Sequence, residues 1–291
     1  LPLTIKGSEN PLPINYLENI GSAQVKSSII LAGLKTEGKT FIKCKPSRDH
    51  TELLCKYLKL PLKVKNKKNY DLIEVEKVNK IKPLNYKIPS DISSAAFFIV
   101  LTAIANNSKL LIKNVNINPS RIGIVTILKK MGVNIQFKNK KNYKGELVAD
   151  ILTTSTKKLK AINCPTKLNS GAIDEFLIIF LVAARAKGVS YFKNLGELNQ
   201  KESPRLEWGA RILKEIGIKT IVTKSSIKIF GDPNIQVNKK IIIRNYLKDH
   251  RVFMTSVIAA LTFGGTWHIH DKSSIKTSFP TFLNIINDLK K

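Results

Sequence analysis

The sequence predicts an α/β fold in which apolar helices lie at the centre and sheets lie outside. Two observations support this. An apolar helical pattern recurs four times, each time followed by a small polar or glycine turn and a short strand. These helices are apolar almost all round and should be buried, whereas the helices and strands between them are half polar. The predicted arrangement is the reverse of a barrel whose helices form the outer ring.

Each repeat begins with a Ser or Asp where an N-cap is expected, followed by the apolar helix. The four starts are roughly 70 to 80 residues apart, which is a long repeat. They fall at Ser22, Asp91, Ser170 and Asp249, and the strands that follow read TFIKC, KLLIKNV, VSYFKNL and TWHIHD.

A second, amphipathic helix follows in each repeat, and two further strands follow the first three of these helices. With a short strand ahead of the first helix, each unit reads β-α-β-α-β-β, and the fourth stops after its second helix. Chance similarity among α/β segments is the alternative. The second helices open at Ser47, Ser120, Ser203 and Ser278, and the leading strands read LPLTIKG, NYKIP, LKAINCP and KKIIIRN.

The composition is that of a globular protein, with 43% hydrophobic and 24% charged residues among 291. This length suggests two domains. The formal net charge of +28 would attract nucleic acid, an acidic membrane or phosphorylated metabolites. Only seven of the 49 basic residues are arginine, the residue preferred for gripping carboxylate or phosphate in a fixed geometry. The arginines therefore carry more information than the lysines.

The cysteines and the apolar runs argue against several classes of protein. Three cysteines without CxxC spacing favour reduced thiols over a disulfide framework or a zinc site. The longest apolar runs are near ten residues, too short to span a bilayer, and no signal-peptide pattern opens the chain. Because the sequence begins at Leu1 inside a predicted strand, we expect a fragment or a processed product.

Polar motifs stand at several of the predicted helix starts. Helix N-termini present free N–H groups and the positive end of the helix dipole, so they bind phosphates and carboxylates. Several of them converging, with Arg and Lys added, would form an anion site. The motifs are Ser22-Ala23-Gln24, Asp174-Glu175, Lys201-Glu202-Ser203-Pro204-Arg205 and Asp249-His250-Arg251.

Eight short motifs together resemble the 5-enolpyruvylshikimate-3-phosphate synthase family from end to end of the chain. No single motif decides the resemblance, but eight in the family's order are specific. They are PLTIKG, SAQVKS, SRDHTE, DISSAAFF, IDEF, KESPRL, DHRVFM and SFPTF, beginning at Pro2, Ser22, Ser47, Asp91, Ile173, Lys201, Asp249 and Ser278.

The resemblance implies a cytoplasmic transferase of the shikimate pathway, which leads to chorismate and the aromatic amino acids. Such an enzyme moves the enolpyruvyl group of phosphoenolpyruvate to the 5-hydroxyl of shikimate 3-phosphate and releases phosphate. It uses no metal or organic cofactor, and we expect a monomer at full length, with neither nucleic acid nor membrane as partner.

The family's fold, an inside-out α/β barrel, has two domains of three β-α-β-α-β-β units each. On this plan the chain carries four of six units. Residues 1–82 would be the last unit of one domain, and residues 83–291 a three-unit domain without its closing strands. We therefore expect the 291 residues alone to have little or no activity.

By resemblance, Ser22, Gln24 and the backbone of Ala23 bind shikimate 3-phosphate, with Gln24 also near phosphoenolpyruvate. Lys201 would also contact shikimate 3-phosphate. Asp174 would hold the attacking hydroxyl of that substrate and take its proton. From sequence alone, a plain helix cap is the commoner role for such an aspartate.

Glu202 resembles the acid that protonates the methylene carbon, and Arg205 and Arg251 the pair that grips phosphoenolpyruvate. The residue types suit the chemistry, because addition needs a base and an acid and elimination reverses their roles. Arg205 as a solvated helix residue and Glu202 as an exposed charge are the alternatives. The roles of Arg48 and Lys276 stay open.

Two other functions compete with this one. An enolpyruvyl transferase acting on UDP-N-acetylglucosamine is similar, but the SAQ and KES-R motifs favour shikimate 3-phosphate. A basic nucleic-acid-binding protein would explain the charge of +28. Against it, the lysines are spread over many segments and no aromatic-basic interleaving is present.

Overall fold

The computed structural model describes residues 2–289 and divides the chain into two compact units. The first unit comprises Leu1–Ile88 together with Asn142–Leu147, and the second comprises Pro89–Lys141 and Val148–Lys291. In both units helices pack on β-sheets, which confirms the predicted α/β class. The count of six units and the boundary at residues 82–83 stay predictions.

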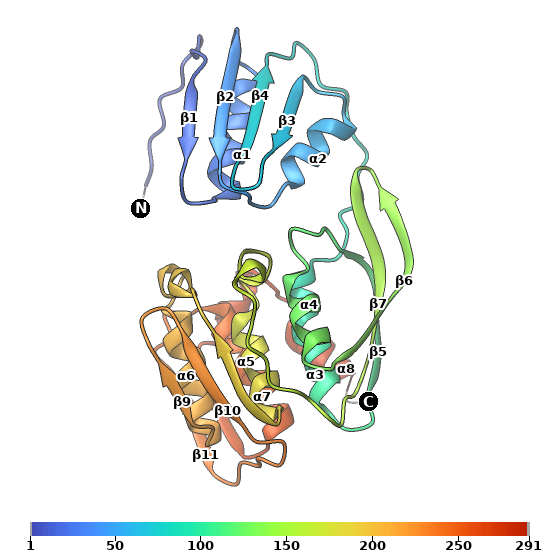
Figure 1. The fold of residues 1–291 in the computed structure, drawn as a ribbon, viewed down its shortest axis with the longest axis vertical. Helices are drawn as coiled ribbons and strands as arrows, with labels where there is room; N and C mark the ends of the chain where they lie inside the picture. The colour runs from blue at the N-terminus through green and yellow to red at the C-terminus, as the bar shows by residue number, and fades with distance from the viewer. Residues whose placement is uncertain (1, 290–291) are drawn as a thin grey trace. The chain divides into compact units, whose positions relative to one another are not determined.

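The first unit is a four-stranded sheet with one face covered by helices (Figure 1). The strand order is β1-β2-β4-β3, with β1 parallel to β2 and the other pairs antiparallel. Alternate residues of β2, such as Ile42, point into a core shared with Ile30 of α1 and Val75 of β4. The elements are β1 (Asn15–Glu18), α1 (Ala23–Gly33), β2 (Lys39–Cys44), α2 (His50–Tyr57), β3 (Leu62–Asn66) and β4 (Asp71–Glu76).

The helix α1 is not buried all round, so the prediction of full burial is wrong for this helix. Only Lys26, Ile30 and Gly33 of α1 are buried, and Leu31 is 59% exposed. The reason is that α1 packs through one face on the sheet, without the helical neighbours found in the second unit. Lys26 is nevertheless fully buried, because its Nζ lies 2.5 Å from Oε1 of Glu52 on α2.

The second unit has the predicted centre of helices with sheets outside (Figure 1). The three helices α3, α5 and α7 contact one another, and nine of the ten residues of α5 are buried. The helices are α3 (Ile92–Ile104), α4 (Gly123–Lys130), α5 (Phe176–Arg185), α6 (Arg205–Ile216), α7 (His250–Phe263) and α8 (Phe282–Asp288).

Three small sheets surround these helices, with orders β5-β7-β6, β8-β10-β9 and β11-β12. The pairs β5–β7, β8–β10 and β9–β10 are antiparallel, and β11 is parallel to β12. The strands are β5 (Lys109–Asn116), β6 (Asn134–Tyr143), β7 (Glu146–Thr154), β8 (Gly188–Phe192), β9 (Thr220–Val222), β10 (Ile227–Gly231), β11 (Lys240–Ile243) and β12 (Thr266–Ile269).

Three of the predicted leading strands are wrong. The LPLTIKG segment forms no strand over its described residues, and the first strand begins later, at Asn15. NYKIP and LKAINCP give way to isolated parallel bridges, among them Ser90 with Val115 and Asn163 with Tyr191. KKIIIRN forms β11 as predicted. Each failed segment has a proline at or near one end (Pro2, Pro89 or Pro165), which removes one backbone donor there.

The cysteines are free thiols, and all three are buried. Burial raises the pKa of Cys44 and of Cys164 to about 11. No helix among residues 2–289 is long and apolar enough to cross a membrane.

The helix α6 approaches α5 closely at Gly209. A Cβ atom at Gly209 would lie 2.6 Å from Cδ2 of Phe180, whose ring is itself packed against Phe192. We predict that Gly209→Ala lowers the free energy of unfolding by about 1–3 kcal/mol, because overpacking forces buried side chains to shift. Urea unfolding measures the loss. Gly196→Ala, whose Cβ would lie 3.5 Å from the nearest atom, is the control, and equal stabilities of the two variants would contradict the prediction.

Candidate functional site

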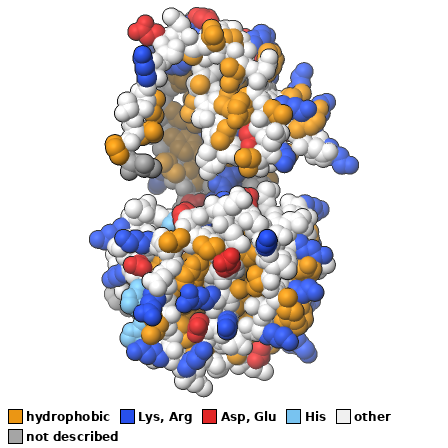
Figure 2. Space-filling view, turned by 90° about the vertical axis from the view of Figure 1, so that its left-hand side faces the viewer, with side chains coloured by type: hydrophobic (Ala, Val, Ile, Leu, Met, Phe, Trp, Pro, Cys, Tyr) orange, Lys and Arg blue, Asp and Glu red, His pale blue; other side chains and the backbone are white. Residues whose placement is uncertain are grey.

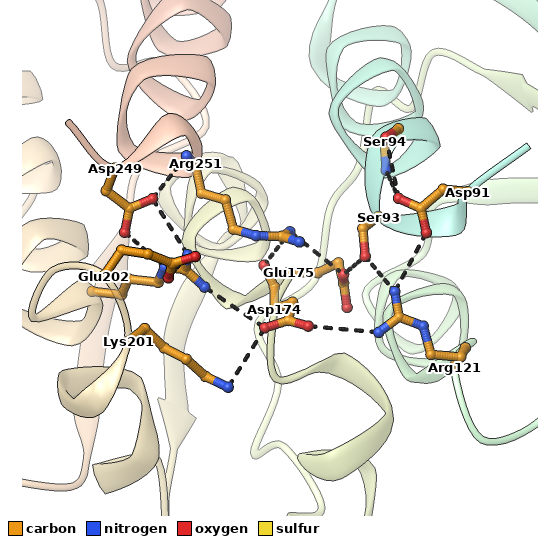
Figure 3. Close-up of polar contacts among 11 residues, drawn as sticks. Asp91, Ser93, Ser94, Arg121, Asp174, Glu175, Lys201, Glu202, Asp249 and Arg251 are labelled. Atoms are coloured by element: carbon orange, nitrogen blue, oxygen red, sulfur yellow. Dashed lines mark hydrogen bonds and ion pairs between the residues drawn. The ribbon is translucent and has the colours of Figure 1, made fainter. Parts of the chain in front are cut away.

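Polar and charged side chains gather where four helices of the second unit begin (Figure 3). Asp91 caps α3 by accepting from the N–H of Ser94, and Asp249 caps α7 by accepting from the N–H of Arg251. Glu175 occupies the N-cap position of α5, and Arg205 is the first residue of α6. Acceptors at caps satisfy the free N–H groups of a first turn, so the predicted starts at Asp91 and Asp249 are confirmed.

Ser22 is confirmed as the N-cap of α1, but Ser170 does not cap α5. Residues Ser170–Ala172 form a 3₁₀ turn, and α5 begins only at Phe176. The displaced start leaves Asp174 outside the helix. Asp174 is therefore not a helix cap, and its carboxylate is directed toward the surrounding cations (Figure 3).

The Asp174 carboxylate faces cations on both of its oxygens. Its Oδ1 lies 3.7 Å from Nζ of Lys201 and 3.6 Å from Nη1 of Arg205. Its Oδ2 lies 3.5 Å from Nη1 of Arg121. The side chain is 14% exposed, enough to be reached from solvent. Three nearby cations favour the ionised carboxylate over the protonated acid.

Arg205 is buried and paired, which contradicts the alternative of a solvated helix residue. Its side chain is 2% exposed, and its Nε donates to Oδ2 of Asp249 at 2.8 Å. Ser203 donates to the same Asp249 oxygen at 2.8 Å, and Arg205 also forms an ion pair with Glu202. Burial alone would raise the pKa of Asp249. Together, the hydrogen bonds and the positive charge of Arg205 outweigh burial and hold that pKa below its ordinary value.

Arg251 reaches toward Asp174 from the first turn of α7. Its Nη1 donates to the backbone carbonyl of Asp174 at 2.8 Å and lies 3.7 Å from Oε1 of Glu175. Burial and the charge of Arg251 lower the pKa of the neighbouring His250, which favours its neutral form.

Lys201 and Glu202 are the more exposed members of the site. Lys201 has a side chain 24% exposed and donates to Glu197 at 2.8 Å as well as facing Asp174. The Glu202 side chain is 53% exposed and contacts Arg205. The second unit therefore brings together the five predicted site residues that it contains. They are Asp174, Lys201, Glu202, Arg205 and Arg251.

The other three predicted site residues lie in the first unit, at the start of α1. Ser22 accepts from the N–H of Val25 at 3.3 Å, Ala23 is the first helical residue, and Gln24 is exposed. The buried pair Lys26–Glu52 joins α1 to α2 just behind this turn. The turn is thus held rigidly within its own unit.

Two members of the cluster, Arg121 and Ser93, were not predicted from the sequence, and Glu175 was predicted only as part of the Asp174-Glu175 motif. Arg121 precedes α4 and has a side chain only 12% exposed. Two features could have identified it: it is one of only seven arginines, and it stands at a predicted helix start. Ser93 carried no distinguishing signal, since serines at helix starts are common.

The enolpyruvyl transferase NikO from Streptomyces tendae is similar with a TM-score of 0.72 at 13% identity, covering 97% of this chain and 65% of that one. This likeness shows the fold alone. An EPSP synthase from Acinetobacter baumannii is similar with a TM-score of 0.85 at 37% identity, over 96% of this chain and 63% of that one.

The family model "EPSP synthase (3-phosphoshikimate 1-carboxyvinyltransferase)" matches residues 1–286, so the chain belongs to the EPSP synthase family. A relative from Ruthia magnifica named 3-phosphoshikimate 1-carboxyvinyltransferase is 41% identical over 99% of this chain. A similarly named relative from Caldicellulosiruptor bescii is 38% identical over 98% of it. The chain spans about 65% of the length of these relatives.

The Arg205–Asp249 pair should dominate the local stability of the site. We predict that Asp249→Asn lowers the free energy of unfolding by about 3–5 kcal/mol at pH 7, because Arg205 loses its one fully buried counter-ion and keeps only the more exposed Glu202 and Asp174. Glu207→Gln, an exposed carboxylate change on α6, is the control.

The same variant tests the pKa of Asp249. Because the pKa of Asp249 is lower in the folded than in the unfolded chain, its ionisation stabilises the fold at pH values above its ordinary pKa of about 3.9. This stabilisation is lost as the pH falls through the folded-state pKa. The stability difference between parent and Asp249→Asn should therefore narrow from pH 6 to pH 3 in urea unfolding. A difference independent of pH would contradict the assignment.

Proposed function

We propose that the chain supplies most of the active site of a 3-phosphoshikimate 1-carboxyvinyltransferase, which transfers the enolpyruvyl group of phosphoenolpyruvate to shikimate 3-phosphate. The observation that carries this proposal is the Asp174 carboxylate set among Arg121, Lys201 and Arg205 with Arg251 alongside. Two anionic substrates require fixed cations, and a hydroxyl nucleophile requires a base. Family membership adds the identity of the substrates.

In the proposed mechanism, ionised Asp174 accepts the proton of the substrate's 5-hydroxyl as its oxygen attacks C2 of phosphoenolpyruvate. Glu202 donates a proton to C3, which becomes a methyl group. In the elimination that follows, C3 loses a proton and the C2–O bond to phosphate breaks, so the enol ether is restored. Reversal of the two acid–base roles between the steps is a general requirement of addition followed by elimination.

The arginines differ in how freely they can meet a substrate anion. Arg205 is held by buried Asp249 and by Glu202, whose side chain is 53% exposed. Glu202 is the partner that can move away at little cost, since exposed ion pairs contribute at most about 1 kcal/mol. Its release would expose part of the Arg205 fork and place the Glu202 carboxyl elsewhere in the site. Bidentate forks suit the carboxylate and phosphate groups of phosphoenolpyruvate.

The binding of nucleic acid is less well supported by the distribution of charge. In Figure 2 the Lys and Arg side chains on the visible face of each unit are interspersed with polar and apolar groups and form no continuous stripe. An enolpyruvyl transferase acting on UDP-N-acetylglucosamine is disfavoured by the family match over residues 1–286.

A fusion protein provides the sharpest test of activity. The 291-residue chain is joined to the part of the Ruthia magnifica relative that lies outside the match, and phosphate release is measured with both substrates. We predict turnover by the fusion and a loss of about 10²- to 10⁴-fold in kcat for Asp174→Asn, the size expected for removing a general base. Unchanged turnover in that variant, or turnover only with UDP-N-acetylglucosamine, would contradict the proposal.

Arg251 is predicted to act mainly on one substrate. Arg251→Lys keeps the charge but loses the planar fork, so the KM for phosphoenolpyruvate should rise about tenfold or more in the fusion. The KM for shikimate 3-phosphate should change much less. Arg211→Lys, which alters an exposed arginine stacked on Trp208, is the matched control. Equal effects on the two KM values would show that Arg251 does not distinguish the substrates.

A further inference from the structure

Five residues of the second unit form a closed ring of polar contacts (Figure 3). Arg121 donates from Nη2 to Oγ of Ser93 at 2.6 Å, and Ser93 donates to Oε1 of Glu175. Glu175 Oε1 lies 3.7 Å from Nη1 of Arg251, which donates to the carbonyl of Asp174. The carboxylate of Asp174 closes the ring at Nη1 of Arg121.

The ring joins segments that are far apart in the sequence. Ser93 lies in the first turn of α3, Arg121 precedes α4, Asp174 and Glu175 precede α5, and Arg251 lies in the first turn of α7. Each of these helices belongs to the helical centre of the unit or packs on it. The relative placement of the helix starts is thereby fixed by side-chain contacts in addition to apolar packing.

Two members of the ring are buried, and their polar groups are engaged by other members of the ring. The Glu175 side chain is 1% exposed, and Ser93 is 3% exposed. Hydrogen bonds in such a low-dielectric environment are strong when satisfied and costly when broken. Glu175 and Ser93 can therefore influence a reaction only through the groups they hold, Arg251 on one side and Arg121 on the other.

We propose that Arg121, Ser93 and Glu175 are positioning residues that hold the Asp174 carboxylate and the Arg251 guanidinium in one fixed relation. The inference rests on the proposed function, in which Asp174 is the base and Arg251 binds phosphoenolpyruvate. Arg121 fixes one carboxylate oxygen directly, while Ser93 and Glu175 carry the constraint from Arg121 to Arg251. Disturbing the buried side of the ring therefore affects proton transfer and substrate binding together.

The ionisation of Glu175 depends on the other members of the ring. Burial raises the pKa of Glu175, and the charge of Asp174 raises it further. Arg251, Arg121 and the hydrogen bond from Ser93 act in the opposite direction. Removing the Ser93 hydroxyl takes away one of the three contacts that stabilise the ionised form of Glu175. The pKa of Glu175 should therefore rise when the ring is broken.

Adjacent serines on α3 offer a matched pair of variants. Ser93→Ala breaks the ring, whereas Ser94→Ala removes a hydroxyl that bonds only to Asp91 among the contacts of the described chain. In the fusion, Ser93→Ala should raise the KM for phosphoenolpyruvate and lower kcat by roughly 3- to 10-fold each, the size of one buried hydrogen bond. Ser94→Ala should match the parent within about 2-fold.

Arg121 variants separate positioning from mere folding. Arg121→Met should shift the acid limb of the kcat profile to higher pH, because a cation is lost beside Asp174. Arg121→Lys keeps the charge and should return the acid limb to its position in the parent. The KM for phosphoenolpyruvate should nevertheless stay raised, since one ammonium cannot replace the two-pronged contact of the guanidinium to Asp174 and Ser93. Equal defects in the Met and Lys variants, with an unmoved acid limb, would overturn the proposal.

A measurement without turnover distinguishes this proposal from the proposed function. Glutamate side chains of the 291-residue chain are labelled with ¹³C, and Glu175 is titrated by NMR, with its resonance assigned from Glu175→Gln. The titration midpoint should be higher in Ser93→Ala than in Ser94→Ala and the parent. Identical titration midpoints in Ser93→Ala, Ser94→Ala and the parent would show that the ring does not act as a coupled unit. A ring intact by NMR in a fusion without turnover would instead refute the proposed function alone.

Discussion

The buried ion pair between Arg205 and Asp249 is the contact on which the candidate site depends. Asp249 is fully buried and accepts hydrogen bonds from the side chains of Arg205 and Ser203 and from the backbone N–H of Arg251. One carboxylate thereby fixes the starts of both α6 and α7. The cost of burying two charges is met only because the remaining polar positions are also satisfied. Arg205 then stands with its Nη1 directed at Asp174, and the placement of the proposed base follows from that of the pair.

The site is therefore assembled from helix starts, and its two sides are secured differently. On the α6 and α7 side, Asp249 gathers donors around a buried carboxylate. On the α3 and α4 side, Arg121 gathers acceptors around a nearly buried guanidinium. Asp174 lies between these two centres, on a segment that a 3₁₀ turn displaces from α5. From this position Asp174 directs one carboxylate oxygen toward Lys201 and Arg205 and the other toward Arg121.

Much of this could be predicted from the sequence, because it depends on local signals. Cap residues predicted three of the four N-caps, and apolar periodicity predicted the burial of α3 and α5. The clustering of Asp174, Lys201, Glu202, Arg205 and Arg251 was expected from the resemblance to the EPSP synthase family. The failures depend on tertiary contacts. Nothing local distinguishes Ser93 from Ser94, yet only Ser93 meets Glu175. Similarly, α1 has an apolar sequence but packs mainly through one face on its sheet, so it stays half exposed.

The contrast between arginine and lysine acquires a structural meaning. Arg121 and Arg205 each contact several acceptors in the site, and Arg251 contacts Asp174 and Glu175. Arg185 donates to the carbonyls of Pro233, Ile235 and Thr262, near the ends of α5 and α7. A planar fork with fixed donors can satisfy several acceptors at once, whereas an ammonium on a flexible stem is better hydrated than buried. Lys26 is buried only because Glu52 meets it directly. The net charge of +28 is thus mainly a property of exposed lysines, while the positions that order the fold and the site are held by a few arginines.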